Sequence, residues 1–162
     1  MTAITSPLMG VDITSTYASA GLVHLPLGTR VVGADQTLFV LVQASGAITQ
    51  YDCVGYDEDF AAAPITKAIA DDGWHIGFAQ VAIASGSLGW VAAEGSNIYV
   101  RLRSGAAADA ALYIGANSAG MLDSDSSGGT NIDGVVAVTG RASAGVSSKC
   151  EIIATSPRST TF

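Results

Sequence analysis

The stretch AQVAIASGSLGWVAAEGSNIYVRLR, residues 79–103, decides the fold class of this chain. Apolar or alternating runs are separated in it by glycine and serine, which is the pattern of short strands joined by tight turns. At its end Ile98, Val100 and Leu102 alternate with polar residues, as they do in a half-buried strand. The stretch therefore predicts three short strands with two glycine turns, and it holds no helical pattern.

The rest of the chain repeats this style, so we expect an all-β fold of about ten short strands in a single β-sandwich or β-barrel, jelly-roll-like in form. Residues 37–44 are apolar on both faces and predict a central, buried strand. Residues 67–72 predict one helical turn, ended by Gly73. The other expected strands or extended segments are residues 29–32, 47–55, 60–66, 74–84, 90–93, 97–103, 110–114, 132–139 and 148–155.

The domain organisation follows from the same reading. We expect an extended N-terminal arm over residues 1–20, one β domain over residues 21–156 and a C-terminal tail over residues 157–162. Between residues 117 and 131 we expect a long polar loop. The sequence shows no tandem repeat with a period of 20–50 residues.

Composition narrows the classes of partner. Hydrophobic residues make up 49% of the chain and charged residues only 13%, so small uncharged residues must cover much of the surface. Such a surface favours protein–protein contact, and we expect a homo-oligomer or an assembled component. The net charge of −7, with lysine only at Lys67 and Lys149, argues against nucleic acid. No run approaches the roughly 20 apolar residues of a membrane span, and the N-terminus lacks a secretory pattern. We therefore expect that a membrane is not a partner of this chain.

The residue types of catalysis are present but do not form a catalytic pattern. Asp57, Glu58 and Asp59 are adjacent carboxylates, which at a strand end usually form a solvated turn. His24 and His75 are the two histidines, and the serines near glycine lack the GxSxG pattern. The glycines match no phosphate-binding loop. We expect a protein that is not an enzyme and that holds no cofactor.

One loop resembles the start of a calcium site. Asp123, Asp125 and Ser127 place oxygen ligands at alternate positions before a glycine. The calcium loop then needs a glutamate at its twelfth position, where this chain has Gly134, with Asp133 one residue short. These three residues are the candidate metal ligands, and the alternative is a polar loop that is solvated or contacts another subunit.

The aromatic residues allow two interpretations. Trp74 and Trp90 are expected to anchor the core, as large aromatic residues usually do. Alternatively, they join Tyr51, Tyr56 and Tyr99 in a platform that binds sugar.

Two further pairs of residues are singled out. Arg101 and Arg103 share one face of a predicted strand with Tyr99, and we expect this exposed stripe to meet a partner: another subunit or, if the resemblance given below holds, the capsid surface. Cys53 and Cys150 are far apart in sequence; buried free thiols are the simpler interpretation, and a disulfide between them stays open.

Four segments resemble a family of small structural proteins from tailed phages. They are LGTRVVGADQTLFVLVQASGAI (residues 27–48), AQVAIASGSLGWVAAEG (79–95), LYIGANSAGMLDSDSSG (112–128) and IDGVVAV (132–138). The pieces that carry the resemblance are the G-T-x-x-x-G-x-D turn, the V-Q-A-x-x-A-I strand and the G-x-x-G-W-V hairpin. The similarity spans residues 27–155 and is to capsid decoration, or cement, proteins.

The resemblance implies a structural virion protein, made in the host cytoplasm, that decorates the outer capsid surface and stabilises the shell by bridging capsomers. Its partners would be the major capsid protein and further copies of itself, as a dimer or trimer, with the arm over residues 1–20 reaching a neighbour. The alternatives are a tail, fibre or minor virion component that binds glycans, and a hydrolase on a β scaffold that uses His24 or His75.

Overall fold

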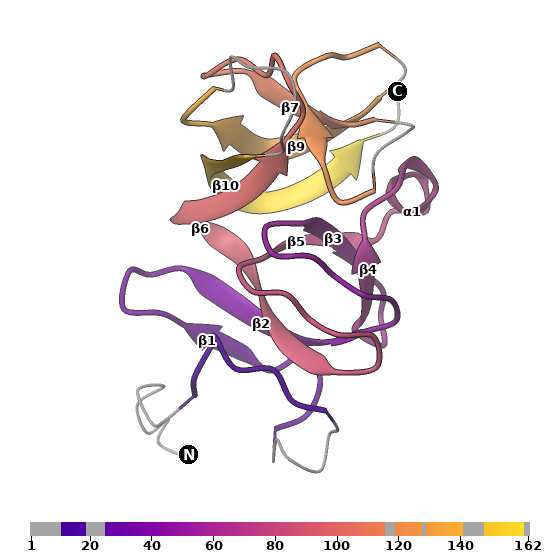
Figure 1. Ribbon diagram of the computed structural model, residues 1–162, viewed down its shortest axis with the longest axis vertical. Coiled ribbons are helices and arrows are strands. Elements are labelled where there is room, and N and C mark those ends of the chain that lie inside the picture. The colour runs from indigo at the N-terminus through magenta and orange to yellow at the C-terminus, as the bar shows by residue number, and fades with distance from the viewer. Residues whose placement is uncertain (1–10, 19–24, 116–118, 128, 141–147, 161–162) are drawn as a thin grey trace.

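The computed structural model describes residues 11–18, 25–115, 119–127, 129–140 and 148–160. Within residues 148–160 the side chains described are those of Ile153, Ala154 and Pro157. The molecule is elongated, with two lobes stacked along its long axis (Figure 1). It is built almost wholly of strands, which confirms the all-β fold class.

Ten strands and one short helix make up the described chain. In chain order they are β1 (Arg30–Val32), β2 (Leu38–Ala44), β3 (Cys53–Tyr56), β4 (Ala61–Pro64), α1 (Lys67–Asp71), β5 (His75–Ala79), β6 (Leu88–Leu102), β7 (Ala111–Ile114), β8 (Leu122–Asp123), β9 (Thr130–Ala137) and β10 (Ser148–Thr160). The strands expected near residues 29–32, 37–44, 110–114 and 132–139 are confirmed, and so are the extended segment at residues 60–66 and the helical turn at residue 67.

The lower lobe is a closed five-stranded barrel, called here the first barrel. Its strands pair in the ring β2–β4–β3–β5–β6 and back to β2, with β2 and β4 parallel and the other pairs antiparallel. Strand β1 adds to β2 outside the ring. Because the barrel is closed, few strand edges are left free to pair with another chain. Proteins often protect such edges with charged side chains, which are scarce in this sequence.

The upper lobe repeats this connectivity and is called here the second ring. Its strands pair in the ring β6–β8–β7–β9–β10 and back to β6, with β6 and β8 parallel and the rest antiparallel. A single pair, Leu102 with Leu122, joins β6 to β8. The tripeptide Ser-Gly-Ala follows the first strand of both rings, at residues 45–47 and 104–106. The two rings are thus an internal repeat of strand connectivity, which the sequence analysis did not detect.

The two rings share β6, which is one strand of 15 residues rather than the two short strands expected at residues 90–93 and 97–103. Its first half pairs with β2 and β5, and its second half pairs with β10. The register against β2 shifts between Leu38 and Phe39, so the strand bulges as it leaves the first barrel. Gly95 follows the bulge, and a Cβ there would lie 2.6 Å from Thr37 Oγ1. The predicted second glycine turn is therefore a bend inside a continuous strand.

The core has two parts. The interior of the first barrel is filled from all five of its strands, with Val42, Val54, Ala62, Ala79 and Val91 among its members. A larger cluster covers the outer face of that barrel and continues into the second ring. Because β2 contributes to both clusters, the prediction that it is buried on both faces is confirmed.

The described part of the N-terminal arm packs against its own chain. Val11, Ile13 and Tyr17 contact the larger core cluster, and Tyr17 exchanges two backbone hydrogen bonds with Leu88. Asp12 forms a turn in which the hydroxyls of Ser15 and Thr14 lower its pKa to about 2. Residues 1–10 and 19–24 lie outside the described residues.

Three expected boundaries are wrong. Strand β10 continues to Thr160, which pairs with Asn131, so residues 157–160 belong to a strand and not to a tail. The strand expected at residues 47–55 begins only at Cys53, and the strand expected at residues 74–84 ends at Ala79. Within the remaining parts of these two segments, Ile48 and Ile83 form an isolated antiparallel bridge, and both side chains are buried in the interior cluster of the first barrel.

Candidate functional site

The described residues line a cavity of about 470 Å³ at one open end of the first barrel. It lies where β2 begins, β3 ends and β5 begins, since Leu38 pairs with Glu94 and Tyr56 pairs with His75. Its lining residues are Arg30, Leu38, Tyr56, Gly73, Trp74, His75, Ile76, Ala93, Glu94 and Pro157. The mouth of a small β-barrel is a common place for a ligand site.

Tyr56 forms the inner wall of this cavity. Its ring belongs to the interior of the first barrel and is only 4% exposed, and it stacks with Phe60 and with His75 at centroid distances of 6.1 and 5.3 Å. Burial raises the pKa of its phenol, against a smaller opposing effect of Arg30. The hydroxyl therefore stays protonated at neutral pH and is able to donate a hydrogen bond.

The rim of the cavity carries both signs of charge. Arg30 on β1 and Glu94 on β6 lie near enough to Tyr56 to act on its pKa in opposite directions. Trp74, half-buried, and His75, exposed, add aromatic surface, and Ile76 and Ala93 add apolar surface. The arrangement combines apolar walls with a donor, an acceptor and a phenol, which suits a small polar ligand.

The expected aromatic platform is divided by the fold. Tyr56 and Trp74 meet at the cavity, but Trp90 is 1% exposed in the core. Tyr51 and Tyr99 form a separate edge-to-face pair, 6.0 Å apart. The prediction that Trp90 anchors the core is confirmed. The same prediction for Trp74 is wrong, because its side chain is half-buried and lines the cavity.

The expected exposed stripe of Tyr99, Arg101 and Arg103 is largely engaged within the chain. The Arg101 side chain is 21% exposed, and its Nη2 lies 2.7 Å from Oδ1 of Asp52. Arg103 lies 3.6 Å from the Asp123 carboxylate. The predicted exposure is therefore wrong for Tyr99 and Arg101 and confirmed for Arg103, and the predicted contact with a partner stays a prediction.

The backbone of the same strand is engaged as well. The Gln80 side chain bonds both the backbone N–H and the carbonyl of Tyr99, and the Arg101 N–H donates to the Tyr51 carbonyl. These contacts connect the two rings. The stripe residues thus hold the molecule together, whereas only Arg103 keeps a substantially exposed side chain, at 44%.

The candidate metal ligands form local turns. Oδ1 of Asp123 accepts the N–H of Asp125, and Oδ1 of Asp125 accepts the N–H of Ser127. The other Asp123 oxygen faces Arg103, which neutralises its charge. Within the described residues no cluster of three metal-ligating side chains forms here or elsewhere.

The residues considered for catalysis are dispersed. Asp57 accepts the backbone N–H groups of Asp59 and Ala61 and so shapes the turn before β4. His75 stacks on Tyr56, and His24 lies outside the described residues. The structure thus brings none of the expected acid–base residues to one point within its described part.

Of the two cysteines, Cys53 is a buried free thiol whose pKa burial raises well above its usual range. Burial keeps it protonated and unreactive. The side chain of Cys150 lies outside the described ones.

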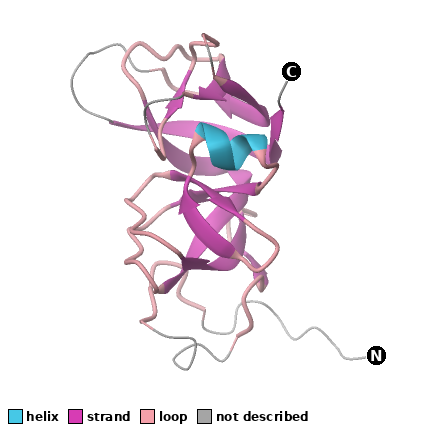
Figure 2. Ribbon diagram, turned by 90° about the vertical axis from the view of Figure 1, so that its right-hand side faces the viewer, coloured by secondary structure: helices cyan, strands magenta, loops and turns pink. Residues whose placement is uncertain are grey.

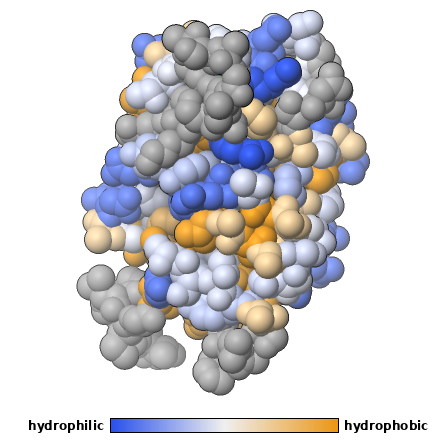
Figure 3. All heavy atoms as spheres, in the orientation of Figure 1, coloured by the Kyte–Doolittle hydropathy of each residue, from blue (hydrophilic) through white to orange (hydrophobic). Residues whose placement is uncertain are grey.

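An exposed apolar patch lies on the second ring and is called here the β9–β10 patch. Val136 and Ile153 are direct register partners, 46% and 44% exposed, and Val138 beyond them is 38% exposed. On the face drawn in Figure 3, hydrophobic residues gather near mid-height below a band of hydrophilic ones. Composition predicted a surface of small uncharged residues suited to protein contact, and the β9–β10 patch adds larger apolar side chains to that surface.

No family model matches this chain, and no curated protein matches it. The described part of the chain contains no helix long and apolar enough to cross a membrane.

The sequence analysis did not identify Asp52, Arg30 or Glu94 as site residues, because an isolated charged residue in or beside a short strand forms no recognisable pattern. Their positions become informative only when the registers of β1, β3 and β6 are known.

Proposed function

We propose that this chain is a structural virion protein that decorates the outer surface of a tailed-phage capsid and bridges its capsomers. The sequence resemblance supplies the class. The observation that carries the proposal is the β9–β10 patch of Val136, Val138 and Ile153, an exposed apolar surface on two paired strands and just beyond the end of β9. Apolar surface presented by a sheet is suited to permanent contact with another protein.

The architecture suits a rigid protein that bridges neighbouring capsomers. Strand β6 runs through both lobes, and closed rings leave few strand edges to pair wrongly. A protein that binds the assembled lattice but not its separated subunits stabilises the lattice by mass action. Many copies, each binding weakly, would add their effects over the shell.

The partner in this proposal is the major capsid protein, with a dimer or trimer of this chain as the bound form. The contact surface is the β9–β10 patch rather than the Arg101 side chain, because Arg101 is committed to Asp52. No catalytic step and no cofactor enter the proposal.

Electron cryo-microscopy of particles assembled with and without this chain tests the proposal. We expect regularly spaced density on the outer shell only when the chain is present. Density confined to the tail would favour the tail or fibre alternative, and no density on the particle would refute a virion role.

A pair of variants tests the surface itself. Val136→Ser with Ile153→Ser should lower capsid occupancy markedly. Val32→Ser is the matched control, since Val32 is equally exposed at 50% but lies on β1 in the other lobe. Equal occupancy of the double variant and the wild type would exclude the patch as the capsid contact.

A further inference from the structure

We propose that copies of this chain associate by strand addition, in which residues 4–8 of one copy pair with the start of β10 on another copy, at Lys149. The inference does not rest on the capsid proposal, because it concerns contacts between copies of the chain. It uses the backbone edge of a strand, whereas the capsid proposal uses the side chains of the β9–β10 patch.

The first barrel and the second ring correspond residue by residue where their last two strands pair. In the first barrel the final register pair of β5 and β6 joins Ala79 to Val91. In the second ring the final register pair of β9 and β10 joins Ala137 to Ile152. Both alanines are fully buried. Val91 and Ile152 therefore occupy equivalent positions in the two rings.

In each ring the chain then leaves this strand pair and crosses to the segment that follows the first strand of the ring. After β5 it reaches Ile83, which forms a bridge with Ile48. After β9 it reaches Gly140, where a Cβ would lie 2.6 Å from the backbone nitrogen of Ala108. Ile48 and Ala108 both follow closely on the Ser-Gly-Ala tripeptide of their ring. The starts of β6 and β10 thus lose the preceding strand as a partner in the same way.

In the first barrel the arm takes the place that β5 has left. Leu88 lies three residues before Val91, and its N–H donates to the Tyr17 carbonyl at 2.7 Å. The Leu88 carbonyl accepts the Tyr17 N–H at 2.9 Å. Val11 and Ile13 of the arm pack against the larger core cluster. The first barrel is therefore completed by an extended segment that pairs with the start of its last strand.

In the second ring the equivalent of Leu88 is Lys149, which lies three residues before Ile152. Its register partner Arg101 donates its N–H to the Tyr51 carbonyl, away from β10. The two therefore form a non-hydrogen-bonded pair, and the N–H and carbonyl of Lys149 also point away from β6. Among the described residues, β9 pairs with β10 only from Ile152 onward, so no described strand meets these two groups.

Residues 1–10 lie outside the described residues, and their sequence repeats the pattern of the arm. The tripeptide Ile-Thr-Ser occurs at residues 4–6 and again at residues 13–15. Two residues after it, each copy of the pattern has a large apolar residue, Leu8 or Tyr17. An exposed strand edge binds an extended segment through main-chain hydrogen bonds, and alternate side chains give the specificity. The chain thus carries a second segment with the residue types that bind this kind of edge.

Two differences between the patterns are compatible with the same pairing. Pro7 has no N–H, but the corresponding Thr16 is not the residue that bonds Leu88, and proline is accepted on the outer side of an edge strand. Ala3 replaces Asp12, whose carboxylate accepts hydrogen bonds only from residues of its own turn. The hydrogen bonds to the barrel do not involve that turn.

The separation of the two edges favours a second copy as the source of the segment. Leu8 and Tyr17 are nine residues apart, which an extended chain spans in about 30 Å. The register partners of Tyr17 and Lys149 are Leu88 and Arg101, which lie thirteen residues apart on β6, or about 40 Å along the strand. Strand β6 runs through both lobes, so the two edges belong to different lobes (Figure 1).

Sedimentation velocity of the full chain over a wide range of concentrations tests the association. We expect an equilibrium between monomers and oligomers. Ile4→Ser combined with Leu8→Ser should raise the dissociation constant about ten-fold or more, because two apolar side chains no longer contribute to the contact. Val32→Ser removes an exposed apolar side chain on β1 and should leave the constant unchanged.

A second pair of variants assigns the contact to β10. Lys149→Pro removes the N–H that points away from β6, whereas Lys149→Ala removes the same charge and keeps this N–H. The proline variant should dissociate about five-fold more readily than the alanine variant, the value of one hydrogen bond. The dispersion of the amide spectrum verifies that each variant is folded. In the wild type, hydrogen exchange of the Lys149 amide should slow as the concentration is raised.

Four outcomes would overturn the proposal. They are a chain that stays monomeric at every concentration, unchanged association in the Ile4 and Leu8 double variant, equal dissociation constants of the two Lys149 variants, and slow exchange at Lys149 that does not depend on concentration. The last result would place the segment on its own chain. A monomeric chain that still gives density on the capsid would refute this inference and leave the capsid proposal intact.

Discussion

The Asp52 carboxylate lies 2.7 Å from the guanidinium of Arg101, and this ion pair joins the first barrel to the second ring. Asp52 precedes β3 and is 2% exposed, and its other oxygen accepts the Thr49 N–H at 2.8 Å. The Arg101 contact brings the two charges together, but Oδ1 has no hydrogen bond from a described residue. Burial therefore outweighs the pairing, and the pKa of Asp52 is raised.

This imbalance predicts unequal effects of removing each partner. Arg101→Met leaves a buried carboxylate without its cation and should lower the free energy of unfolding by about 3 kcal/mol at neutral pH. Asp52→Asn should cost less, because the fold already disfavours the ionised form and Arg101 is able to reach water. Chemical denaturation of the two variants and of the double variant measures this. Equal costs for the two single variants would contradict the argument.

The same group predicts a pH dependence. Because its pKa in the folded chain is above the ordinary value of 3.8, the native state binds the proton more tightly than the unfolded state. The contribution of Asp52 to stability therefore falls as pH rises from about 3.8 to the raised native pKa. Subtracting the curve of Asp52→Asn from that of the wild type isolates the effect. The window should extend to higher pH in Arg101→Met.

Gly120 is predicted to be irreplaceable, because it fills the space beside Asp52. Its N–H and carbonyl bond Ile65 and Cys53, its φ is 73°, and a Cβ would lie 2.5 Å from Asp52 Cγ. Gly120→Ala should lower the free energy of unfolding by about 3 kcal/mol or more.

Two other glycines separate the causes of that effect. Gly86 has a positive φ but open space around it, so Gly86→Ala should cost about 1–2 kcal/mol. Gly46 has open space and no positive φ, and Gly46→Ala should be nearly neutral. Thermal denaturation of the three variants should rank them in this order, and a neutral Gly120→Ala would contradict the close contact.

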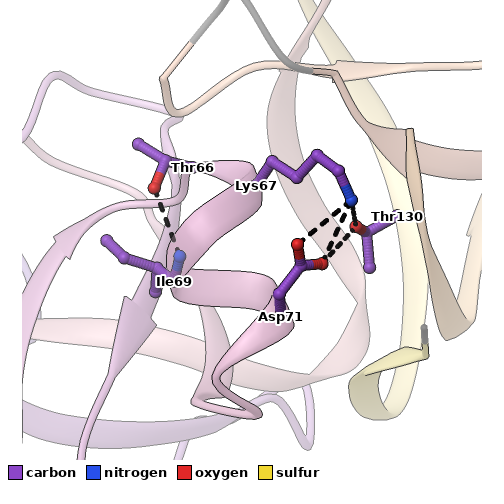
Figure 4. A network of polar contacts seen from close by, with 5 residues as sticks. All are labelled: Thr66, Lys67, Ile69, Asp71 and Thr130. Atoms are coloured by element: carbon purple, nitrogen blue, oxygen red, sulfur yellow. Dashed lines mark hydrogen bonds and ion pairs between the residues drawn. The ribbon is translucent and has the colours of Figure 1, made fainter. Parts of the chain in front are cut away.

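The short helix is tied to the second ring by a polar network (Figure 4). Thr66 caps α1 by accepting the Ile69 N–H, and Lys67 pairs with Asp71 at 3.1 Å. The hydroxyl of Thr130 on β9 donates to Asp71 at 2.8 Å. Figure 2 shows the helix beside the junction of the two lobes.

This network predicts the ionisation of Asp71. The hydrogen bond from Thr130 is the main cause that lowers the pKa of Asp71, followed by Lys67. Thr130→Val should therefore raise that pKa toward its ordinary value, as followed by carboxyl NMR. Thr29→Val, which removes a hydroxyl bonded to Pro26, should leave it unchanged. An unaltered Asp71 in Thr130→Val would refute the network.

The two tryptophans should differ in their effect on stability. Trp90→Ala removes a fully buried indole and should cost about 3–5 kcal/mol, whereas Trp74→Ala should cost less than half as much because Trp74 is half-buried. Urea denaturation compares them directly. If the two variants lost similar amounts of free energy of unfolding, Trp74 would contribute to the core as Trp90 does, which would contradict the prediction.

Local patterns in the sequence determined the fold class and most strand positions. Alternation and apolar runs fix which residues turn inward, so β2, the buried faces of β6 and the turn at α1 followed from neighbours a few residues apart. Trp90 was identified as a core residue in the same way. Such patterns do not identify the partner of a strand.

Tertiary structure decided everything that depends on pairing between distant segments. The bend at Gly95 resembles a turn until β2 and β10 are seen to hold the two halves of β6. The Asp52–Arg101 pair and the cavity at Tyr56 likewise depend on registers between strands far apart in the chain. The physical reason is that a strand's side-chain period is set by its own backbone, whereas its hydrogen bonds are made to another segment that the local sequence does not specify.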